Sequence, residues 1–307
     1  MEISVILPNQ SKSKQPLQIL KKIGEGKFSV YQTYCPLQKT TYALKAFPKD
    51  AYGANQYQKE ALLANLSHPN IIQNIPISIE NSEDAHFYPV LTEFAQYGDF
   101  FKLVVGGVLN SEVIMRTYFH QLIAAVDHMH SKKVAHLDLK LENLMMGNDF
   151  IMKIIDFDQA QNTTDQKLTS GGTKGFRAPE VINGDCTDFC AADIYSAGVI
   201  LYAFKAQEYP FGECKDGQTT TLKCYTTFMR CNQEFWKAKS NQKKDKNFFS
   251  DSFKELINGM LDVDVIARFT IEDIKRSKWY KGPVLDNKAL IKEMKPRWDN
   301  FIKNRKD

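Results

Sequence analysis

Four polar residues near the middle of the chain have the types and the spacing that phosphoryl transfer requires. Asp138, Lys140 and Asn143 fall within six residues, and Asp156 follows Asp138 by eighteen residues. The reaction needs a carboxylate that orients the attacking hydroxyl or accepts its proton, a cation near the transferred phosphate, and oxygen ligands for Mg²⁺. A single Asp is more often a surface or helix-capping residue, but four suitable groups in register favour a catalytic centre.

A glycine turn and a lysine precede this centre in the chain. Gly24 and Gly26 lack a Cβ, so backbone N–H groups could approach phosphate oxygens there, although a plain hairpin turn has the same pattern. Lys45 ends a strand-like run fifteen residues after Val30, and a helical segment with Glu60 follows. We expect Lys45 and Glu60 to form an ion pair that directs the ammonium at nucleotide phosphates.

The elements that must position these residues follow from the hydrophobic pattern. Residues 17–90 contain short β-branched and aromatic runs broken by Gly, Pro and Asn, which is typical of strands, with one helix expected over about 54–66. From Ser111 onward, apolar residues recur every three or four positions and predict amphipathic helices. The longest apolar stretch, 194–204, is too short to cross a bilayer and is expected to be a core helix. Further helices are expected over 191–204, 253–261 and 271–279.

In this order, and over residues 17–279, the motifs resemble those of the eukaryotic protein kinase family, Ser/Thr type. The segment His136–Asn143 is similar to H-R-D-L-x-x-x-N, and Asp156 opens a triplet where the family has Asp-Phe-Gly. The calcium/calmodulin-dependent branch looks closest. The resemblance implies an α+β, bilobal protein kinase fold with a small β-rich N-lobe and a larger, mainly helical C-lobe. The implied division is a leader at 1–16, the N-lobe at 17–95, the C-lobe at 96–280 and a basic tail at 281–307.

The resemblance also implies that ATP binds with Mg²⁺ between the lobes. Thr92 would be the gatekeeper of the nucleotide pocket, the backbone of residues 93–95 would bond adenine, and Asp99 would contact the ribose. The implied nucleotide-binding residues are Gly24, Gly26, Ser29, Val30, Ala43, Lys45, Thr92, Glu93, Ala95 and Asp99. The implied catalytic residues are Asp138, Lys140, Lys45, Glu60 and Thr173, and the implied metal ligands are Asn143 and Asp156.

The segment 172–180 is similar to the end of a kinase activation loop, which in the family docks a peptide. Thr173 would place its hydroxyl against Asp138 and Lys140, which favours Ser or Thr in a protein substrate over Tyr. A peptide platform of this kind argues against a lipid or small-molecule kinase. The family pattern further implies a structural ion pair between Glu180 and Arg268.

Three departures from the family pattern bear on activity. Leu137 replaces the Arg that pairs with a phosphorylated activation loop, so we expect activity without that phosphorylation (a non-RD kinase). The alternative is that Leu137 merely packs while Lys167 or Arg177 supplies the cation. Asp158 replaces Gly, and Ser29 replaces the third loop glycine. The alternative to an active enzyme is therefore a pseudokinase that binds nucleotide and acts as a scaffold.

The net charge and the cysteines limit which binding partners and which cellular compartment are expected. The net charge of +4 is too mild to indicate nucleic-acid binding, and neither a membrane segment nor a secretory signal is expected. The six cysteines form no C-x-x-C pair, which suits a cytoplasmic protein or a nuclear one. The basic tail could be a helix that binds calmodulin or another regulator, or a helix packed on the large lobe.

Overall fold

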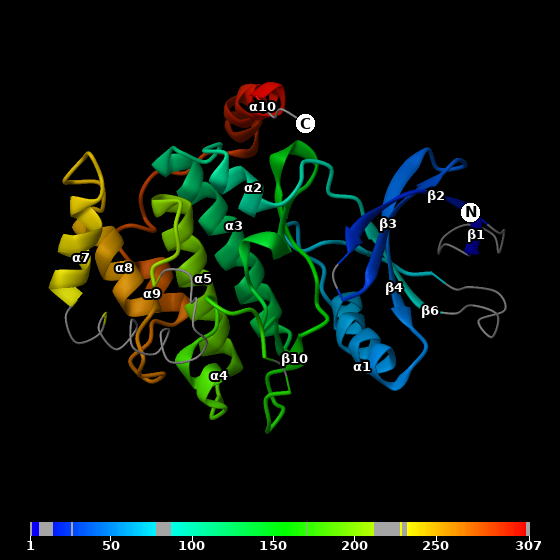
Figure 1. Ribbon diagram of the computed structural model, residues 1–307, viewed down its shortest axis with the longest axis horizontal. Helices are drawn as coiled ribbons and strands as arrows, with labels where there is room; N and C mark the ends of the chain where they lie inside the picture. Colours follow the sequence, from blue (N-terminus) through cyan, green and yellow to red (C-terminus); the bar gives the residue numbers. More distant parts are fainter. Residues whose placement is uncertain are drawn as a thin grey trace.

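The protein has a sheet-rich lobe and a helical lobe, which are joined by the segment that follows strand β6 (Phe87–Glu93) (Figure 1). The computed structural model describes residues 2–5, 15–25, 27–77, 87–169, 171–211, 228 and 232–304. Gly26 therefore lies outside the described residues. The small lobe has two small clusters of buried hydrophobic residues against its sheet, and one large core surrounds the central helices.

The small lobe is one antiparallel sheet with a helix against it. Its strands pair in the order β1-β2-β3-β4-β6-β5. Their bounds are β1 Glu2–Val5, β2 Gln15–Glu25, β3 Ser29–Cys35, β4 Thr40–Pro48, β5 Asn74–Ile75 and β6 Phe87–Glu93. The expected leader over 1–16 is not all outside the sheet, because β1 pairs with β2. The runs of β-branched and aromatic residues explain the strands.

The helix of the small lobe begins earlier than the sequence predicted. Helix α1 spans Ala51–Glu60 and continues as the 3₁₀ turn η1, Ala61–Asn65. Asp50 caps its start by accepting a hydrogen bond from the backbone N–H of Gly53. An Asp N-cap satisfies one of the unpaired N–H groups of the first turn, which accounts for the early start. The last residue of α1 is Glu60, so the helix contributes the carboxylate of this residue to the site.

The large lobe is built around α5, a helix that is apolar on all sides. Its 18 residues are long and apolar enough to cross a membrane, but 89% of them are buried inside the protein, so α5 is the core helix that the sequence predicted. Helices α3 and α8 pack against it. The helices of this lobe are α2 Phe100–Val105, α3 Glu112–Ser131, α4 Pro179–Asn183, α5 Phe189–Ala206, α7 Asn232–Asn241, α8 Asp251–Met260, α9 Ile271–Arg276 and α10 Asn287–Asn304.

Two small antiparallel pairs position the central polar residues. They are β7 (Val134–Ala135) with β10 (Gln161–Asn162), and β8 (Leu144–Met146) with β9 (Met152–Ile154). The 3₁₀ turns η2 (Leu141–Asn143) and η3 (Asn148–Phe150) flank β8. Because Leu144 is opposite Ile154, the chain before β8 and the chain after β9 emerge at the same end of the hairpin. Asn143 and Asp156 therefore lie at the same end of the β8–β9 hairpin.

The basic tail is a helix packed on the large lobe, as one of the two interpretations of the sequence predicts. On α10, Trp298 makes an edge contact with Tyr97 at 5.2 Å between ring centroids, and Tyr97 stacks on Phe150 at 4.5 Å. Phe301 lies so close to Gly106 that a Cβ there would collide with its ring. Figure 1 shows α10 at the top of the large lobe, near α2.

Candidate active site

A cavity of about 600 Å³ lies between the lobes and collects most of the residues predicted to bind the nucleotide. Gly24, Val30 and Ala43 line it from the sheet, and Met145 and Ile155 line it from the large lobe. The hinge contributes Thr92, Glu93, Phe94 and Ala95. Apolar walls with a few polar groups are typical of small-molecule sites. Ile23, Phe28, Met145 and Ile155 were not predicted, because single apolar residues carry no recognisable spacing.

Asp99 caps α2, and the ribose contact expected of it stays a prediction. Its Oδ1 accepts a hydrogen bond from the backbone N–H of Lys102 at 2.9 Å, and its Oδ2 pairs with Lys102 Nζ at 2.7 Å. The carboxylate therefore caps α2 and is not among the residues that line the cavity. Asp is a common N-cap, so capping competes with the expected ribose contact.

The β2–β3 turn is short. Glu25 pairs with Ser29, so only three residues separate them. Ser29 is a regular residue of β3 and also lies outside the cavity lining, so a side chain is tolerated where the family has glycine. Phe28 turns inward: its ring is 4.5 Å from that of Phe47 and 5.7 Å from Lys45 Nζ. The aromatic residue forms part of the cavity wall.

Lys45 holds two carboxylates together, one from each lobe. Its Nζ lies 3.0 Å from Glu60 Oε2 and 2.5 Å from Asp156 Oδ1. The predicted Lys45–Glu60 ion pair is confirmed. Burial alone would lower the pKa of Lys45, but Glu60 and Asp156 outweigh burial and raise it above its ordinary value. Lys45 therefore stays protonated at neutral pH.

The two carboxylates compete for this single ammonium, and their pKa values shift in opposite directions. Burial raises the pKa of Glu60 against the influence of Lys45. Burial also acts on Asp156, but Lys45 outweighs it and lowers the pKa of Asp156. The difference follows from the neighbouring charges: His136 and Lys140 also lower the pKa of Asp156, whereas Asp156 and Asp158 add to the effect of burial on Glu60.

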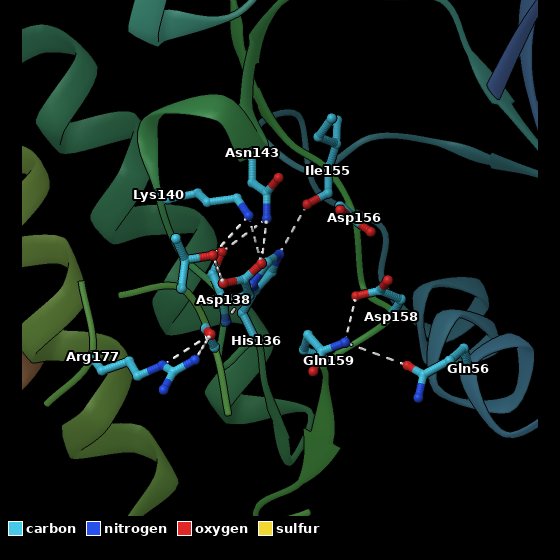
Figure 2. A network of polar contacts seen from close by, with 12 residues as sticks. Gln56, His136, Asp138, Lys140, Asn143, Ile155, Asp156, Asp158, Gln159 and Arg177 are labelled. Atoms are coloured by element: carbon cyan, nitrogen blue, oxygen red, sulfur yellow. Dashed lines mark hydrogen bonds and ion pairs between the residues drawn. The ribbon is translucent and has the colours of Figure 1, made fainter. Parts of the chain in front are cut away.

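Asp138 and Lys140, in the loop after β7, are both in contact with Thr173 of the 172–180 segment. Figure 2 shows Asp138 and Lys140 side by side in this loop. Lys140 Nζ donates to Asp138 Oδ2 at 2.9 Å and to Thr173 Oγ1 at 2.8 Å. Thr173 Oγ1 in turn donates to Asp138 Oδ1 at 2.6 Å. Asn143 Nδ2 donates to the Asp138 backbone carbonyl at 2.9 Å, which turns its amide oxygen away from Asp138. The hydroxyl of Thr173 thus lies against Asp138 and Lys140, as predicted.

The backbone of this loop is held by a buried carboxylate on α5. Asp193 accepts hydrogen bonds from the backbone N–H groups of His136 and Leu137, both at 2.8 Å. Leu137 has φ 62°, a left-handed conformation that a non-glycine residue adopts only when its surroundings hold it there. Its carbonyl lies where a Cβ on Gly172 would approach to 2.6 Å, so Gly172 must lack a side chain. The loop and the 172–180 segment are in direct contact.

Asp193 also bonds His130, and this contact makes stability depend on pH. Burial would lower the pKa of His130, but the hydrogen bond that His130 Nε2 donates to Asp193 and the contact with Cys190 outweigh burial and raise the pKa to about 10. The unfolded value is about 6.5, so the contribution is complete below about pH 6.5 and is lost as pH rises through about 10. We expect the free energy of unfolding to fall between about pH 6.5 and 10, and His130→Gln to abolish that fall. Urea unfolding at several pH values measures this, and parallel curves for the two proteins would contradict it.

The comparisons with known proteins agree with this geometry. The model of the family described as protein kinase domain matches residues 17–280. The chain belongs to the protein kinase family. It is 32% identical over 278 residues to CBL-interacting protein kinase 11 of Oryza sativa subsp. japonica, covering 87% of this chain and 52% of the relative. It is 31% identical over 286 residues to CBL-interacting serine/threonine-protein kinase 2 of Arabidopsis thaliana, covering 89% and 58%. The chain spans about half the length of such curated relatives.

The structural ion pair expected of this kinase is present. Arg268 donates to Glu180 Oε1 at 2.5 Å and to Oε2 at 2.9 Å, and both residues are buried. Arg268 also bonds the backbone carbonyls of Asp262 and Ala191. The pair joins the 172–180 segment to the base of the large lobe and so anchors the segment that carries Thr173.

Two of the three departures from the kinase pattern, Leu137 and Asp158, lie in the large lobe and have distinct local structures. Leu137 is buried, and the guanidinium of Arg177 donates to the carbonyl oxygen of Gly172 through Nε at 2.9 Å and through Nη2 at 2.5 Å. Asp158 is not among the described residues with positive φ, so it adopts its backbone conformation without the strain that the loss of glycine suggested. Burial and the Asp156 charge raise the pKa of Asp158.

Proposed function

We propose that this kinase transfers the γ-phosphoryl group of ATP to a Ser or Thr hydroxyl of a protein substrate. The observation that carries the proposal is the contact of Asp138, Lys140 and Thr173 at the wall of a cavity where Lys45 already joins Glu60 to Asp156. All the charged groups that the reaction needs are assembled.

The reaction follows from these positions. Asp138 orients the substrate hydroxyl and accepts its proton as the oxygen–phosphorus bond forms and the bond to the ADP leaving oxygen breaks. Lys140 stabilises charge on the transferred group, and Lys45 holds the α- and β-phosphates. Thr173 keeps Asp138 and Lys140 in register through its two hydrogen bonds.

The donor set also fits Mg²⁺, which would neutralise charge on the β- and γ-phosphates. Asp156 offers a carboxylate at the cavity wall. Asn143 gives its amide N–H to Asp138 and so retains its amide oxygen for a ligand role. Carboxylate and amide oxygens are the protein ligands that hard cations prefer. We assign the metal to Asn143 and Asp156.

Activity without activation-loop phosphorylation is part of the proposal. The family's Arg is replaced by the buried Leu137, and the loop backbone is supported instead by Asp193. Arg177 bonds the Gly172 carbonyl directly, so the end of the activation loop has a cation-assisted contact that requires no phosphate. The alternative interpretation, in which Leu137 merely packs and Lys167 or Arg177 supplies the cation for a loop phosphate, predicts instead that transfer is lost after phosphatase treatment.

The second candidate is a nucleotide-binding pseudokinase, and Asp158 is the observation that favours it. A third carboxylate beside Asp156 and Glu60 could compete for Lys45. Asp158, however, accepts a hydrogen bond from Gln159 Nε2 at 2.9 Å, whereas Lys45 forms its ion pairs with Glu60 and Asp156. The active enzyme therefore remains our first proposal.

The proposed partners are a protein substrate and a regulatory protein. Several relatives are named as CBL-interacting kinases, which supports regulation by a protein partner in general. On α10, Trp298 and Phe301 are packed against the large lobe, so the docked helix does not present them to calmodulin. We place the protein in the cytoplasm or the nucleus. In the part of the chain that the structure describes, Cys35, Cys186 and Cys190 are thiols and not disulfides, which suits that assignment.

The test is transfer of labelled phosphate from Mg-ATP to a panel of Ser/Thr peptides by protein pretreated with phosphatase. We expect transfer that survives the treatment and is absent in Asp138→Asn. A rate that falls to background after phosphatase would contradict the independence from phosphorylation. Binding of ATP without transfer to any peptide would instead favour the pseudokinase.

A further inference from the structure

Three buried polar side chains connect the two lobes beside the cavity (Figure 2). Gln56 belongs to α1 in the small lobe, whereas Asp158 and Gln159 follow β9 in the large lobe. Gln159 Nε2 donates to Asp158 Oδ1 at 2.9 Å and to Gln56 Oε1 at 3.4 Å. The three residues are 7%, 5% and 8% exposed in chain order. The family's catalytic pattern leaves Gln56 and Gln159 without a role.

The chemistry of the amide explains how one side chain can make both contacts. An NH₂ group has two hydrogens, one for each acceptor oxygen. Buried polar groups are costly when they lose their partners, so this arrangement favours the position of α1 in which all three are satisfied. Glycine at position 158 would provide no acceptor. The departure from the family pattern thus supplies the second acceptor of the Gln159 amide, while Gln56 supplies the acceptor in the other lobe.

The contact acts on the same face of α1 as the predicted ion pair. Gln56 precedes Glu60 by four residues, and residues at that spacing lie on one side of a helix. Glu60 bonds Lys45 at 3.0 Å, and Gln56 bonds Gln159. The helix is therefore tied at two points, one to the sheet of its own lobe and one to the other lobe. A shift of α1 away from Asp156 would break the second tie and separate Glu60 from the shared ammonium.

We propose that Gln56 and Gln159 are positioning residues that hold α1 against the Asp156–Gln159 segment, so that the Lys45–Glu60–Asp156 arrangement stays assembled without a phosphorylated activation loop. The inference rests on the proposed transfer function and deepens it. It assigns the regulation of α1 to an internal contact.

The variants for the test are Gln56→Met, Gln159→Met and the double variant, because Met keeps the length of Gln and removes its amide. Gln58→Met is the matched control, since Gln58 lies on the same helix and is exposed. Hydrogen exchange of the α1 amides is measured in each protein, together with kcat and KM for ATP and for the peptide. Exchange in α3 reports on global stability.

We expect each single Met variant to exchange its α1 amides about five- to tenfold faster than the wild type, as loss of roughly one net hydrogen bond implies. The kcat is expected to fall by a similar factor with KM for the peptide unchanged. The double variant is expected to be no worse than the more affected single variant, because both changes break one contact. Gln58→Met is expected to match the wild type.

Unchanged α1 exchange would overturn the inference, and so would additive effects in the double variant. Exchange that rises equally in α1 and α3 would also overturn it, since that result indicates general destabilisation. The exchange measurement needs no turnover. A wild type that transfers no phosphate would therefore contradict the proposed function alone, while the positioning of α1 would still be decided by exchange.

Discussion

Replacing Lys45 with Met is expected to lower kcat by about 10²- to 10³-fold, the usual effect of removing one preorganised charged donor from a reaction site. Lys45 is the group that joins Glu60 in the small lobe to Asp156 in the large lobe. Its side chain is only 13% exposed, so water replaces it poorly. In Lys45→Met, two adjacent carboxylates lose their shared cation, and the nucleotide phosphates lose theirs.

The matched control is Lys254→Met on α8, where Lys254 pairs with the fully exposed carboxylate of Asp251. That change is expected to leave kcat within a factor of about two, because exposed pairs contribute about 0–1 kcal/mol. Phosphate transfer from Mg-ATP measures both variants, and a thermal shift with Mg-ATP reports whether the nucleotide still binds. A Lys45→Met protein with a rate within tenfold of the wild type would show that Lys45 is not the central cation.

The largest effect on stability is expected from Arg268→Met. Arg268 is bidentate to Glu180, and the two side chains are 0% and 9% exposed. Removing one partner leaves a buried carboxylate without its cation, which costs about 3–5 kcal/mol of unfolding free energy. The Asp262 and Ala191 carbonyls lose their donor as well. Urea unfolding followed by circular dichroism measures the difference.

An exposed ion pair supplies the control for Arg268. Lys275 pairs with Asp127 at 2.6 Å, but the two side chains are 41% and 42% exposed. Lys275→Met is expected to cost about 0–1 kcal/mol, because solvent screens such a pair. The expected difference in stability between the two variants depends on burial and not on distance. If the two variants lost similar stability, burial would not be the deciding factor at Arg268.

The catalytic residues could be predicted from the sequence because their spacing within short segments is itself the signal. Asp138, Lys140 and Thr173 are an example. Thr173 follows Lys140 by 33 residues and matches the hydroxyl position of the family pattern. Its Oγ1 lies 2.8 Å from Lys140 Nζ. The Lys45–Glu60 pair was predicted for a similar reason, because a strand lysine followed by a helix carboxylate leaves few other partners.

Contacts that depend on competing local structure or on packing between lobes could not be predicted. Asp99 could bind a ribose or cap a helix by its type alone, and only the structure shows that α2 begins one residue later and that Asp99 caps it. The contact between Gln56 and Gln159 spans 103 residues and has no periodic pattern. Phe28 follows a glycine turn like many exposed residues, and only the fold shows it turned inward against Phe47.

The most direct test of the account compares wild type and Asp138→Asn for phosphate transfer from Mg-ATP to Ser/Thr peptides, with ATP binding measured in parallel. The variant removes the negative charge and the proton acceptor while keeping the shape of the side chain. The account predicts transfer by the wild type and a loss of about 10²- to 10⁴-fold in the variant with ATP binding retained, which is the contribution of a general base. Equal rates in the two proteins, or no transfer by the wild type to any peptide, would contradict it.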